Sequence, residues 1–248
     1  MMIKVPFPTP VNYSIEELKR RLLTLKQQEK LSIFGKKRNS AIGESLEKYL
    51  GLSKNSSKKA DWGDYELKTI SQTSGKLRLM SLNWDYLKKY SAKQLVLDYG
   101  KNHFSKHLEK PVIRLDWKIP YSAKHIDKLH YRINDKNKLE LLFNKEVLAS
   151  NNLDKFENHY MQKMRNLVLV EVEINNDQTF KIERVKLLEY TSFRHLLTAI
   201  KKNIVELSFA LMLIEPNSTK EKFNNRGSSL RIPLKKISNL YEDESIIC

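Results

Sequence analysis

The sequence predicts an α/β (α+β) fold in which helices flank a mixed β-sheet. Two observations support this class. Segments with helical spacing of apolar residues and segments with strand-like alternation both occur, and they are mixed without strict alternation. The chain of 248 residues is long enough to bury a core without disulfides, and it shows neither an internal repeat nor a separating linker. We therefore expect one unit over residues 1–248.

The N-terminal part predicts two amphipathic helices and a strand. The first helix covers residues 14–30, where Ser14 can cap the helix with Glu17 three residues later. The basic loop "GKKRNS" follows, and the second helix covers about 40–50. After the polar loop "GLSKNSSKKA" comes the strand that contains "ELKTI". The segment "KLRLMSL" is its expected hairpin partner, with Ser74 and Gly75 in the turn.

The rest of the chain predicts further strands and two helices. The helices are expected at 151–163 and 192–202, and residues 204–214 read as a buried strand. The polar loop "EPNSTKEKFNNRGSS" then leads to the short strand "LRI". The other strands are expected at 112–119, 138–143, 167–174 and 179–185.

The charge of the chain points to a polyanionic partner. Forty-five Lys and Arg residues face 29 Asp and Glu residues, which gives a formal charge of +16 and a pI near 9.7. A field of this sign attracts nucleic acid, although a general bias towards solvated lysines would give the same count. No apolar stretch has the length of a membrane span, the start does not resemble a signal peptide, and only one cysteine is present. These features predict a soluble, cytoplasmic protein.

The segment "DWGDYELKTI" (61–70) contains a dense group of charged residues that indicates a metal-binding or catalytic site. In a strand, Asp64, Glu66 and Lys68 share one face, and Asp61 can reach that face from the preceding turn. Like charges held this close need a cation among them, and a divalent metal ion is the obvious candidate. The alternative is a solvated face with cross-strand ion pairs.

The spacing Asp-x(4)-Glu-x-Lys is the minimal signature of a metal-dependent nuclease. Phosphodiesters resist attack because their oxygens repel an anionic nucleophile. Divalent metal ions neutralise that charge and lower the pKa of a bound water. Carboxylate oxygens suit Mg2+, and the lysine can orient the water, help to deprotonate it or stabilise the developing charge.

Three segments carry a resemblance to known nucleases. "AIGESLEKYLGLSKNSSKKADWGDYELKTI" (41–70) resembles the MutH family of endonucleases, in which a helix ending on Leu-Gly is followed by a polar loop, an Asp and Glu-Leu-Lys-Thr. "FNNRGSSLRIPLKKISNLY" (223–241) and "NLVLVEVEI" (166–174) are similar to segments of the BcnI/MvaI branch of type II restriction endonucleases. The short gap between Asp61 and Glu66 is also similar to that branch.

The resemblance implies a PD-(D/E)xK core that hydrolyses double-stranded DNA with Mg2+. It further implies a monomeric type II restriction enzyme that leaves 5'-phosphate and 3'-hydroxyl ends, with a cognate DNA methyltransferase encoded nearby in a restriction-modification system. The catalytic segment would be about 40–120, and the DNA-recognition segment about 190–241. Two alternatives stay open: a MutH-like strand-nicking enzyme of mismatch repair, and a DNA-binding module without catalysis.

Site residues follow from the resemblance position by position. Asp61 and Glu66 would ligate the metal, and Lys68 would be the catalytic lysine. Glu47 matches the helix glutamate of the family, but it can equally be a surface residue. Strand alternation alone favours Asp64 over Asp61 as the second ligand, whereas the family spacing favours Asp61, which we adopt.

The expected DNA contacts lie in two polar segments. Where the relatives begin the loop with His and Asp, this chain has Asn224 and Asn225 before Arg226 and a glycine. Because asparagine reads bases differently from histidine, we expect a different target sequence. Arg226 is expected to read guanine, with a phosphate contact or a surface salt bridge as the alternative. Phosphate contacts are expected from Lys36, Lys37 and Arg38.

Overall fold

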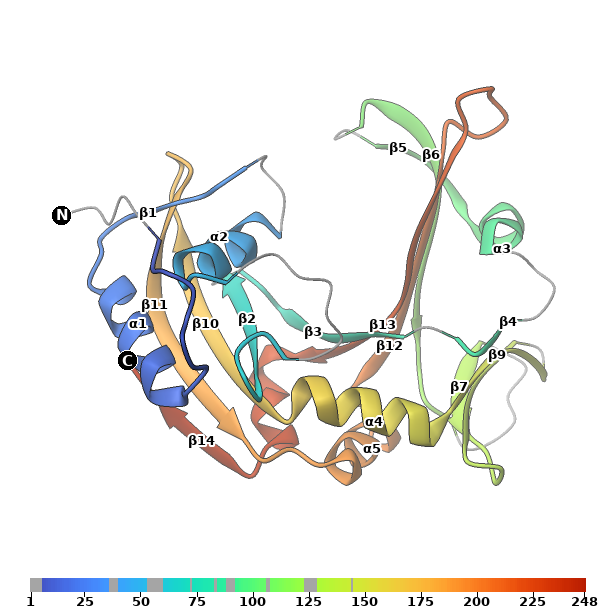
Figure 1. The fold of residues 1–248 in the computed structure, drawn as a ribbon. Coiled ribbons are helices and arrows are strands. Elements are labelled where there is room, and N and C mark those ends of the chain that lie inside the picture. The colour runs from blue at the N-terminus through green and yellow to red at the C-terminus, as the bar shows by residue number, and fades with distance from the viewer. Residues whose placement is uncertain are drawn as a thin grey trace. The chain divides into compact units, whose positions relative to one another are not determined.

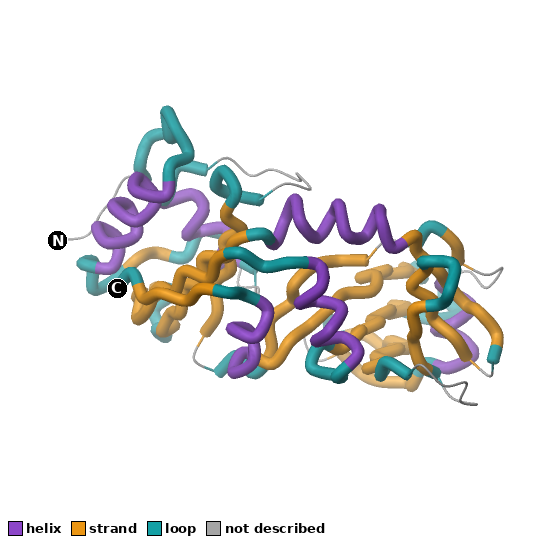
Figure 2. Tube along the Cα trace, turned by 90° about the horizontal axis from the view of Figure 1, so that it is seen from below, coloured by secondary structure: helices purple, strands orange, loops and turns teal. Residues whose placement is uncertain are grey.

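The computed structural model describes most of the chain (Figure 1). The described residues are 6–35, 40–52, 60–71, 73–82, 84–87, 92–105, 108–122, 129–143 and 145–248; the side chains of 87, 92 and 224–227 are not described. Within these ranges no helix is long and apolar enough to cross a membrane. The mixture of helices and strands that the sequence predicts is visible in Figure 2.

The chain divides into two compact units, each made of separate stretches of sequence. Unit 1 comprises Met1–Leu77, Asn158–His195 and Leu234–Cys248, and unit 2 comprises Arg78–Glu157 and Leu196–Pro233. The segments expected at 40–120 and 190–241 therefore each contribute to both units. Two helices run across the boundaries, α4 (Leu153–Met164) and α5 (Phe193–Lys201).

Unit 1 is built on one mixed sheet. Its strands run in the order β1 (Leu31–Ser32), β11 (Thr179–Glu189), β10 (Asn166–Ile174) and β2 (Tyr65–Ser71), and β14 (Asp243–Ile246) also pairs with β11. β2 and β10 are parallel, and β10 and β11 are antiparallel. The 3-10 helix η1 (Leu234–Leu240) precedes β14.

The core of unit 1 lies between this sheet and two helices. These are α1 (Ile15–Lys26), which Ser14 caps as predicted, and α2 (Ala41–Tyr49). The C-terminal residues Ile247 and Cys248 pack against the same core, beside α1 in Figures 1 and 2. The buried core side chains are Leu18, Leu22, Leu25, Leu31, Leu46, Tyr49, Leu50, Trp62, Leu67, Val168, Val170, Val172, Phe180, Ile182, Val185 and Leu187.

Among the described residues, unit 2 contains two sheets, one short helix of its own, and parts of α4 and α5. A five-stranded sheet has the order β3 (Lys76–Leu82), β13 (Lys222–Pro233), β12 (Glu206–Ile214), β6 (Lys110–Ile119) and β5 (Lys101–Ser105). A second sheet has the order β4 (Tyr86–Leu87), β9 (Glu146–Asn152), β8 (Lys138–Phe143) and β7 (His130–Ile133). Helix α3 (Ala92–Tyr99) packs on β6 and β12.

Gly100 allows α3 to end close to β6. A Cβ at this position would lie 2.5 Å from Ile113 Cγ2 and 2.3 Å from the Val96 carbonyl oxygen, so no larger residue fits without a shift.

Two predictions about local structure are wrong. The segment "KLRLMSL" forms β3, but β3 pairs with β13 in unit 2, while β2 pairs with β10. The expected hairpin is therefore not among the strand pairings of the described residues, and the partner of β2 lies about a hundred residues later. The polar segment expected as a loop is also shorter: from Lys222 onwards it belongs to β13.

Candidate active site

A two-residue turn sets the position of the acidic cluster. Trp62 and Tyr65 exchange both backbone hydrogen bonds, at 2.9 and 2.8 Å, around Gly63 and Asp64. Gly63 has φ +56°, and a Cβ there would lie 2.9 Å from the Tyr13 carbonyl oxygen. Glycine is thus required both by the backbone conformation and by the close approach of the chain. The turn delivers the chain directly into β2.

Trp62 anchors this turn to the segment before α1. Its side chain is fully buried, and its Nε1 donates a 2.9 Å hydrogen bond to the Ser14 carbonyl oxygen. Its ring also meets Tyr13 edge-to-face. A buried indole with a satisfied N–H is a rigid anchor, and this anchor fixes the neighbouring Asp61.

Asp61 turns back onto β2 and Asp64 does not. The Oδ2 of Asp61 accepts a hydrogen bond of 3.1 Å from the backbone N–H of Leu67, one residue from Glu66. Asp64 lies in the turn and is exposed, before the strand begins at Tyr65. The geometry therefore groups Asp61, and not Asp64, with the carboxylate of Glu66.

Glu66 and Lys68 leave the same face of β2, as predicted from alternation. Glu66 is only 1% exposed, and Lys68 Nζ donates to its Oε1. The other oxygen, Oε2, lies 3.0 Å from Lys163 Nζ. That ammonium is within ion-pair distance but lacks the direction of a hydrogen bond, so Oε2 is buried without a hydrogen-bond partner.

Sequence reasoning did not find Lys163. It lies near the C-terminal end of α4, and β10 then starts at Asn166 and runs parallel to β2 with Leu167 opposite Glu66. Lys163 is brought to Glu66 by this parallel pairing. No local pattern predicts the pairing, because its two strands are distant in sequence.

Glu47 belongs to the same cluster. Helix α2 lies over β2 near Thr69, where a Cβ on Gly43 would be in ordinary contact with Thr69 Oγ1 at 3.8 Å. Partial burial and the negative charge of Asp61 raise the pKa of Glu47 to about 7, against the opposing effect of Lys68. The charge of Glu66 raises it further. The pKa of Glu47 therefore depends on the charges of Asp61, Glu66 and Lys68.

Burial dominates the electrostatics of Glu66. Removal from water raises the pKa of this carboxyl, Lys68 lowers it, and the negative charge of Asp61 raises it again. Lys163 also lowers it. The two lysines are the cations that a buried carboxylate needs.

The side chains present are suited to a hard divalent metal ion. Carboxylate oxygens are the ligands that Mg2+ prefers, and Glu66 Oε2 is a buried oxygen that lacks a hydrogen bond. Within the described ranges, no three His, Cys, Asp or Glu side chains form a metal-binding group as they stand. The lysines hold Glu66 in this arrangement, so a metal ion would compete with them.

The expected DNA-binding residues fall outside this cluster. Lys36, Lys37 and Arg38 lie outside the described residues. Asn224, Asn225 and Arg226 belong to β13 in unit 2, where the backbone of Asn224 pairs with Met212 and that of Asn225 with Leu211. The register shifts between Phe209 and Leu211, so an irregularity interrupts β12 and β13 at this point.

A protein-family model and solved structures match this chain. The model of the MvaI/BcnI restriction endonuclease family matches residues 20–241. The chain is similar to a solved complex of the restriction endonuclease MvaI with its cognate DNA substrate, with a TM-score of 0.75, 17% identity, and coverage of 95% of this chain and 99% of that one. MvaI solved without DNA matches with a TM-score of 0.48 and 16% identity, over 98% and 100% of the two chains. No curated protein matches.

Proposed function

The chain belongs to the MvaI/BcnI restriction endonuclease family, a family of site-specific nucleases, and from that premise we propose that it cuts both strands of double-stranded DNA at a short specific sequence. The reaction is Mg2+-dependent hydrolysis that leaves 5'-phosphate and 3'-hydroxyl ends. The observation that carries the proposal is the cluster of Asp61, Glu66 and Lys68 on and beside one strand. The similarity to an MvaI–DNA complex supports DNA as the substrate.

Each residue of the cluster has a distinct role in this proposal. Asp61 and Glu66 would hold the metal ion, which when bound would neutralise phosphate charge and supply an activated water. Lys68 is the catalytic lysine: released from Glu66, its ammonium can orient the attacking water or stabilise the charge that develops on the phosphate. Glu47 stands next to the ligands, and its proton equilibrium depends on their charge.

The cellular setting follows from the activity. An enzyme that cuts unmodified DNA endangers its own host, so we propose that a cognate DNA methyltransferase is encoded nearby. We propose further that the protein acts as a monomer in the cytoplasm, with its two units working as one nuclease. Asn224, Asn225 and Arg226 read the target, and Lys36, Lys37 and Arg38 hold phosphates.

Digestion of phage DNA tests the activity. Purified protein with Mg2+ should convert the DNA into discrete fragments, and sequencing of the fragment ends would give the recognition site, the stagger and the end chemistry. Without metal, in EDTA, no cleavage is expected. Glu66→Ala and Lys68→Ala should abolish cleavage and leave DNA binding within a few-fold, because they act on the transition state and not on the phosphate contacts.

The outcomes separate the competing functions. Nicks in one strand, or cleavage only with an added activator, would favour a mismatch-repair type of enzyme over a restriction enzyme. DNA binding without cleavage in Mg2+ would overturn the nuclease proposal. Cleavage at near wild-type rate by either alanine variant would refute the site assignment while leaving the activity in place.

A further inference from the structure

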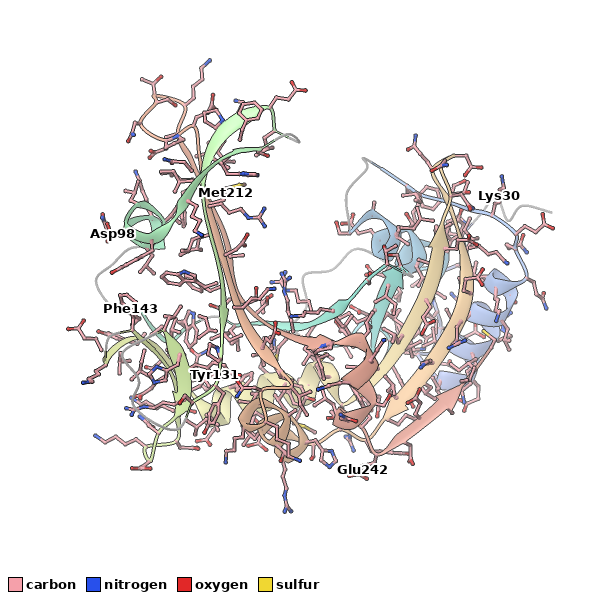
Figure 3. All side chains as sticks on the ribbon, turned by 180° about the vertical axis from the view of Figure 1, so that it is seen from behind. Lys30, Asp98, Tyr131, Phe143, Met212 and Glu242 are labelled. Atoms are coloured by element: carbon pink, nitrogen blue, oxygen red, sulfur yellow. The ribbon has the colours of Figure 1, made fainter. Side chains whose placement is uncertain are left out.

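Arg21 is a buried cation in the first helix of unit 1. It lies in α1, which packs on β11, and Lys30, labelled in Figure 3, lies between this helix and β1. Only 4% of Arg21 is exposed. A guanidinium that is removed from water needs hydrogen bonds and an opposite charge to offset the cost. The partners of Arg21 therefore show which segments it holds together.

The guanidinium joins three segments of unit 1. Its Nη1 donates to the carbonyl oxygen of Pro8 at 2.7 Å and to that of Leu50 at 2.6 Å, and its Nε donates to Glu17 at 2.7 Å. Glu17 lies one turn earlier in α1, Pro8 belongs to the segment before that helix, and Leu50 is the C-cap of α2. Arg21 therefore connects α1, the N-terminal segment and the end of α2.

Two aromatic rings face the same guanidinium. The central carbon of Arg21 lies 5.0 Å from the centroid of the Phe7 ring and 5.5 Å from that of Trp62. Both distances are within the range of a cation–π contact, which strengthens when the cation is desolvated. Trp62 is the fully buried anchor of the turn beside Asp61. Arg21 therefore also contacts the turn that sets the position of a proposed metal ligand.

The elements that Arg21 connects carry two of the site carboxyls, Asp61 and Glu47. Glu47 lies in α2, one turn before the C-cap Leu50. Asp61 directly precedes Trp62. Mg2+ demands near-ideal octahedral geometry with oxygen ligands at about 2.0–2.1 Å, so its binding is sensitive to small shifts of the surrounding carboxyls. A shift of α2 against the turn would change the spacing between Glu47 and Asp61.

A purely stabilising role for Arg21 is the alternative. Replacing a buried ion pair by well-packed apolar side chains is often neutral or stabilising, so the charge itself is weak evidence for a stabilising role. A planar guanidinium, however, fixes the directions of its donors, which an apolar side chain does not. The three hydrogen bonds of Arg21 therefore favour a role in geometry.

We propose that Arg21 is a positioning residue of the nuclease site, and that it fixes the end of α2 against the turn that carries Asp61. Glu47, on α2, is thereby held at a constant distance from Asp61. The proposal rests on the proposed function, since it takes Asp61 as a ligand of the catalytic metal ion. Arg21 acts through the carbonyl oxygen of Leu50 and through the ring of Trp62.

Matched variants in α1 test the proposal. Arg21→Met keeps a long side chain and removes the guanidinium. Arg20→Met is the first control, because Arg20 pairs with the same Glu17, but 59% of its side chain is exposed and its described hydrogen bonds do not involve α2 or the Trp62 turn. Leu25→Ala is the second control, because it disturbs the buried core under α1 without removing a charge.

Metal binding and cleavage are measured separately, at a temperature at which circular dichroism shows every variant to be folded. Mn2+ binding, followed by electron paramagnetic resonance without DNA, should weaken about 10- to 100-fold in Arg21→Met, as expected when a residue that orients metal ligands is lost. Cleavage of a plasmid should show a lower kcat and require more Mg2+, with an unchanged KM for DNA. Arg20→Met and Leu25→Ala should match the wild-type protein in both measurements, because a loss of stability alone does not change the metal affinity of the folded protein.

The outcomes separate positioning from stabilisation. Unchanged Mn2+ affinity in Arg21→Met, or an equal loss in either control, would overturn the proposal. If Arg21→Met does not fold, Arg21→Lys takes its place, because lysine keeps the charge beside Glu17 but has a single nitrogen instead of the planar fork. The Mn2+ affinity of Arg21→Lys should then fall, and a wild-type value would overturn the proposal.

The same experiment distinguishes this proposal from the proposed function. A wild-type protein that cuts no DNA in Mg2+ would refute the proposed function. If the wild-type protein cuts DNA and Arg21→Met behaves like Arg20→Met, only the positioning role of Arg21 fails.

Discussion

Glu66 is a buried carboxylate whose two oxygens face two different lysines. Removing such a group from water is costly, and the cost is offset only by close opposite charges and hydrogen bonds. Lys68 supplies a hydrogen bond to Oε1, but Lys163 offers Oε2 only its charge. Oε2 of Glu66 is therefore buried beside a cation but without a hydrogen bond.

At the same scale, the two aspartates of the turn are predicted to differ in function. Asp61→Asn should lose nearly all cleavage, because its carboxylate lies against β2 beside Glu66. Asp64→Asn should retain substantial cleavage, because Asp64 is exposed in the turn. Steady-state cleavage of a plasmid substrate over a range of Mg2+ concentrations would measure both. The reverse result would transfer the ligand role to Asp64.

Glu47 gives a pH prediction for the metal-free protein. The pKa of Glu47 is about 7 in the folded protein, whereas the ordinary pKa of a glutamate is 4.5. Between these values the unfolded chain has released the proton and the folded chain still holds it, so this group makes stability fall as pH rises from about 4.5 to 7. Glu47→Gln removes the effect.

Melting temperatures in EDTA measure this effect. From pH 5 to pH 8 the wild-type protein should lose roughly a few degrees relative to Glu47→Gln. Parallel melting curves at all pH values would show that Glu47 ionises normally.

At the scale of elements, the strand that carries the motif could be predicted and its neighbours could not. Alternation along "ELKTI" correctly placed Glu66 and Lys68 on one face, since side-chain direction is a local property of a strand. The pairing of β2 with β10, and of β3 with β13, joins segments about a hundred or more residues apart. Neighbouring strands often pair, so the local hairpin was the natural expectation.

Contacts between segments that are distant in sequence also explain which features of the site the sequence did not predict. Helical spacing correctly predicted α2 and α4. Glu47 could equally have been a surface residue by sequence, and its dependence on the motif follows only from the packing of α2 near Thr69 and from the charges that raise its pKa. Nothing in "ENHYMQKMRN" distinguishes Lys163 from a solvated lysine, because its partner is supplied by another element.

Helix α4 is therefore predicted to stabilise the metal-free site through Lys163. Lys163→Met should lower the stability of the protein in EDTA by about 1–3 kcal/mol, since it leaves Oε2 of a buried carboxylate without an opposite charge. Added Mg2+ should reduce this deficit, because a bound cation takes over the role of the ammonium. Chemical denaturation with and without Mg2+ measures the two values.

Lys155→Met is the matched control for α4. Lys155 lies on the same helix, but its side chain is 74% exposed and its ion pair with Asp85 is on the surface. Its loss should change stability by no more than about 1 kcal/mol, independently of Mg2+. Similar deficits for both lysines, or a deficit at Lys163 that Mg2+ does not reduce, would contradict a role in the site.

At the scale of the whole molecule, the charge of +16 and the family match over residues 20–241 concern both units. Asp61, Glu66 and Lys68 belong to unit 1, whereas Asn224, Asn225 and Arg226 belong to unit 2. Composition alone pointed to nucleic acid, but it could not say which lysines face DNA.

The last prediction separates reading of the sequence from holding of the DNA. Arg226 lies in β13 and is followed by a glycine. It comes two residues after Asn224, whose backbone pairs with Met212 on β12. A guanidinium can hold guanine O6 and N7 together, which is worth about 1–3 kcal/mol against a wrong base. Arg226→Ala should therefore weaken binding to the cognate duplex about 5- to 150-fold, and binding to a random duplex only slightly.

Lys220→Ala, in the exposed turn before β13, is the control. Titration of both duplexes at two salt concentrations decides between the roles: a phosphate contact would lower both affinities together and reduce the salt slope by about one. Equal losses would remove base reading from Arg226 and leave recognition to its asparagine neighbours.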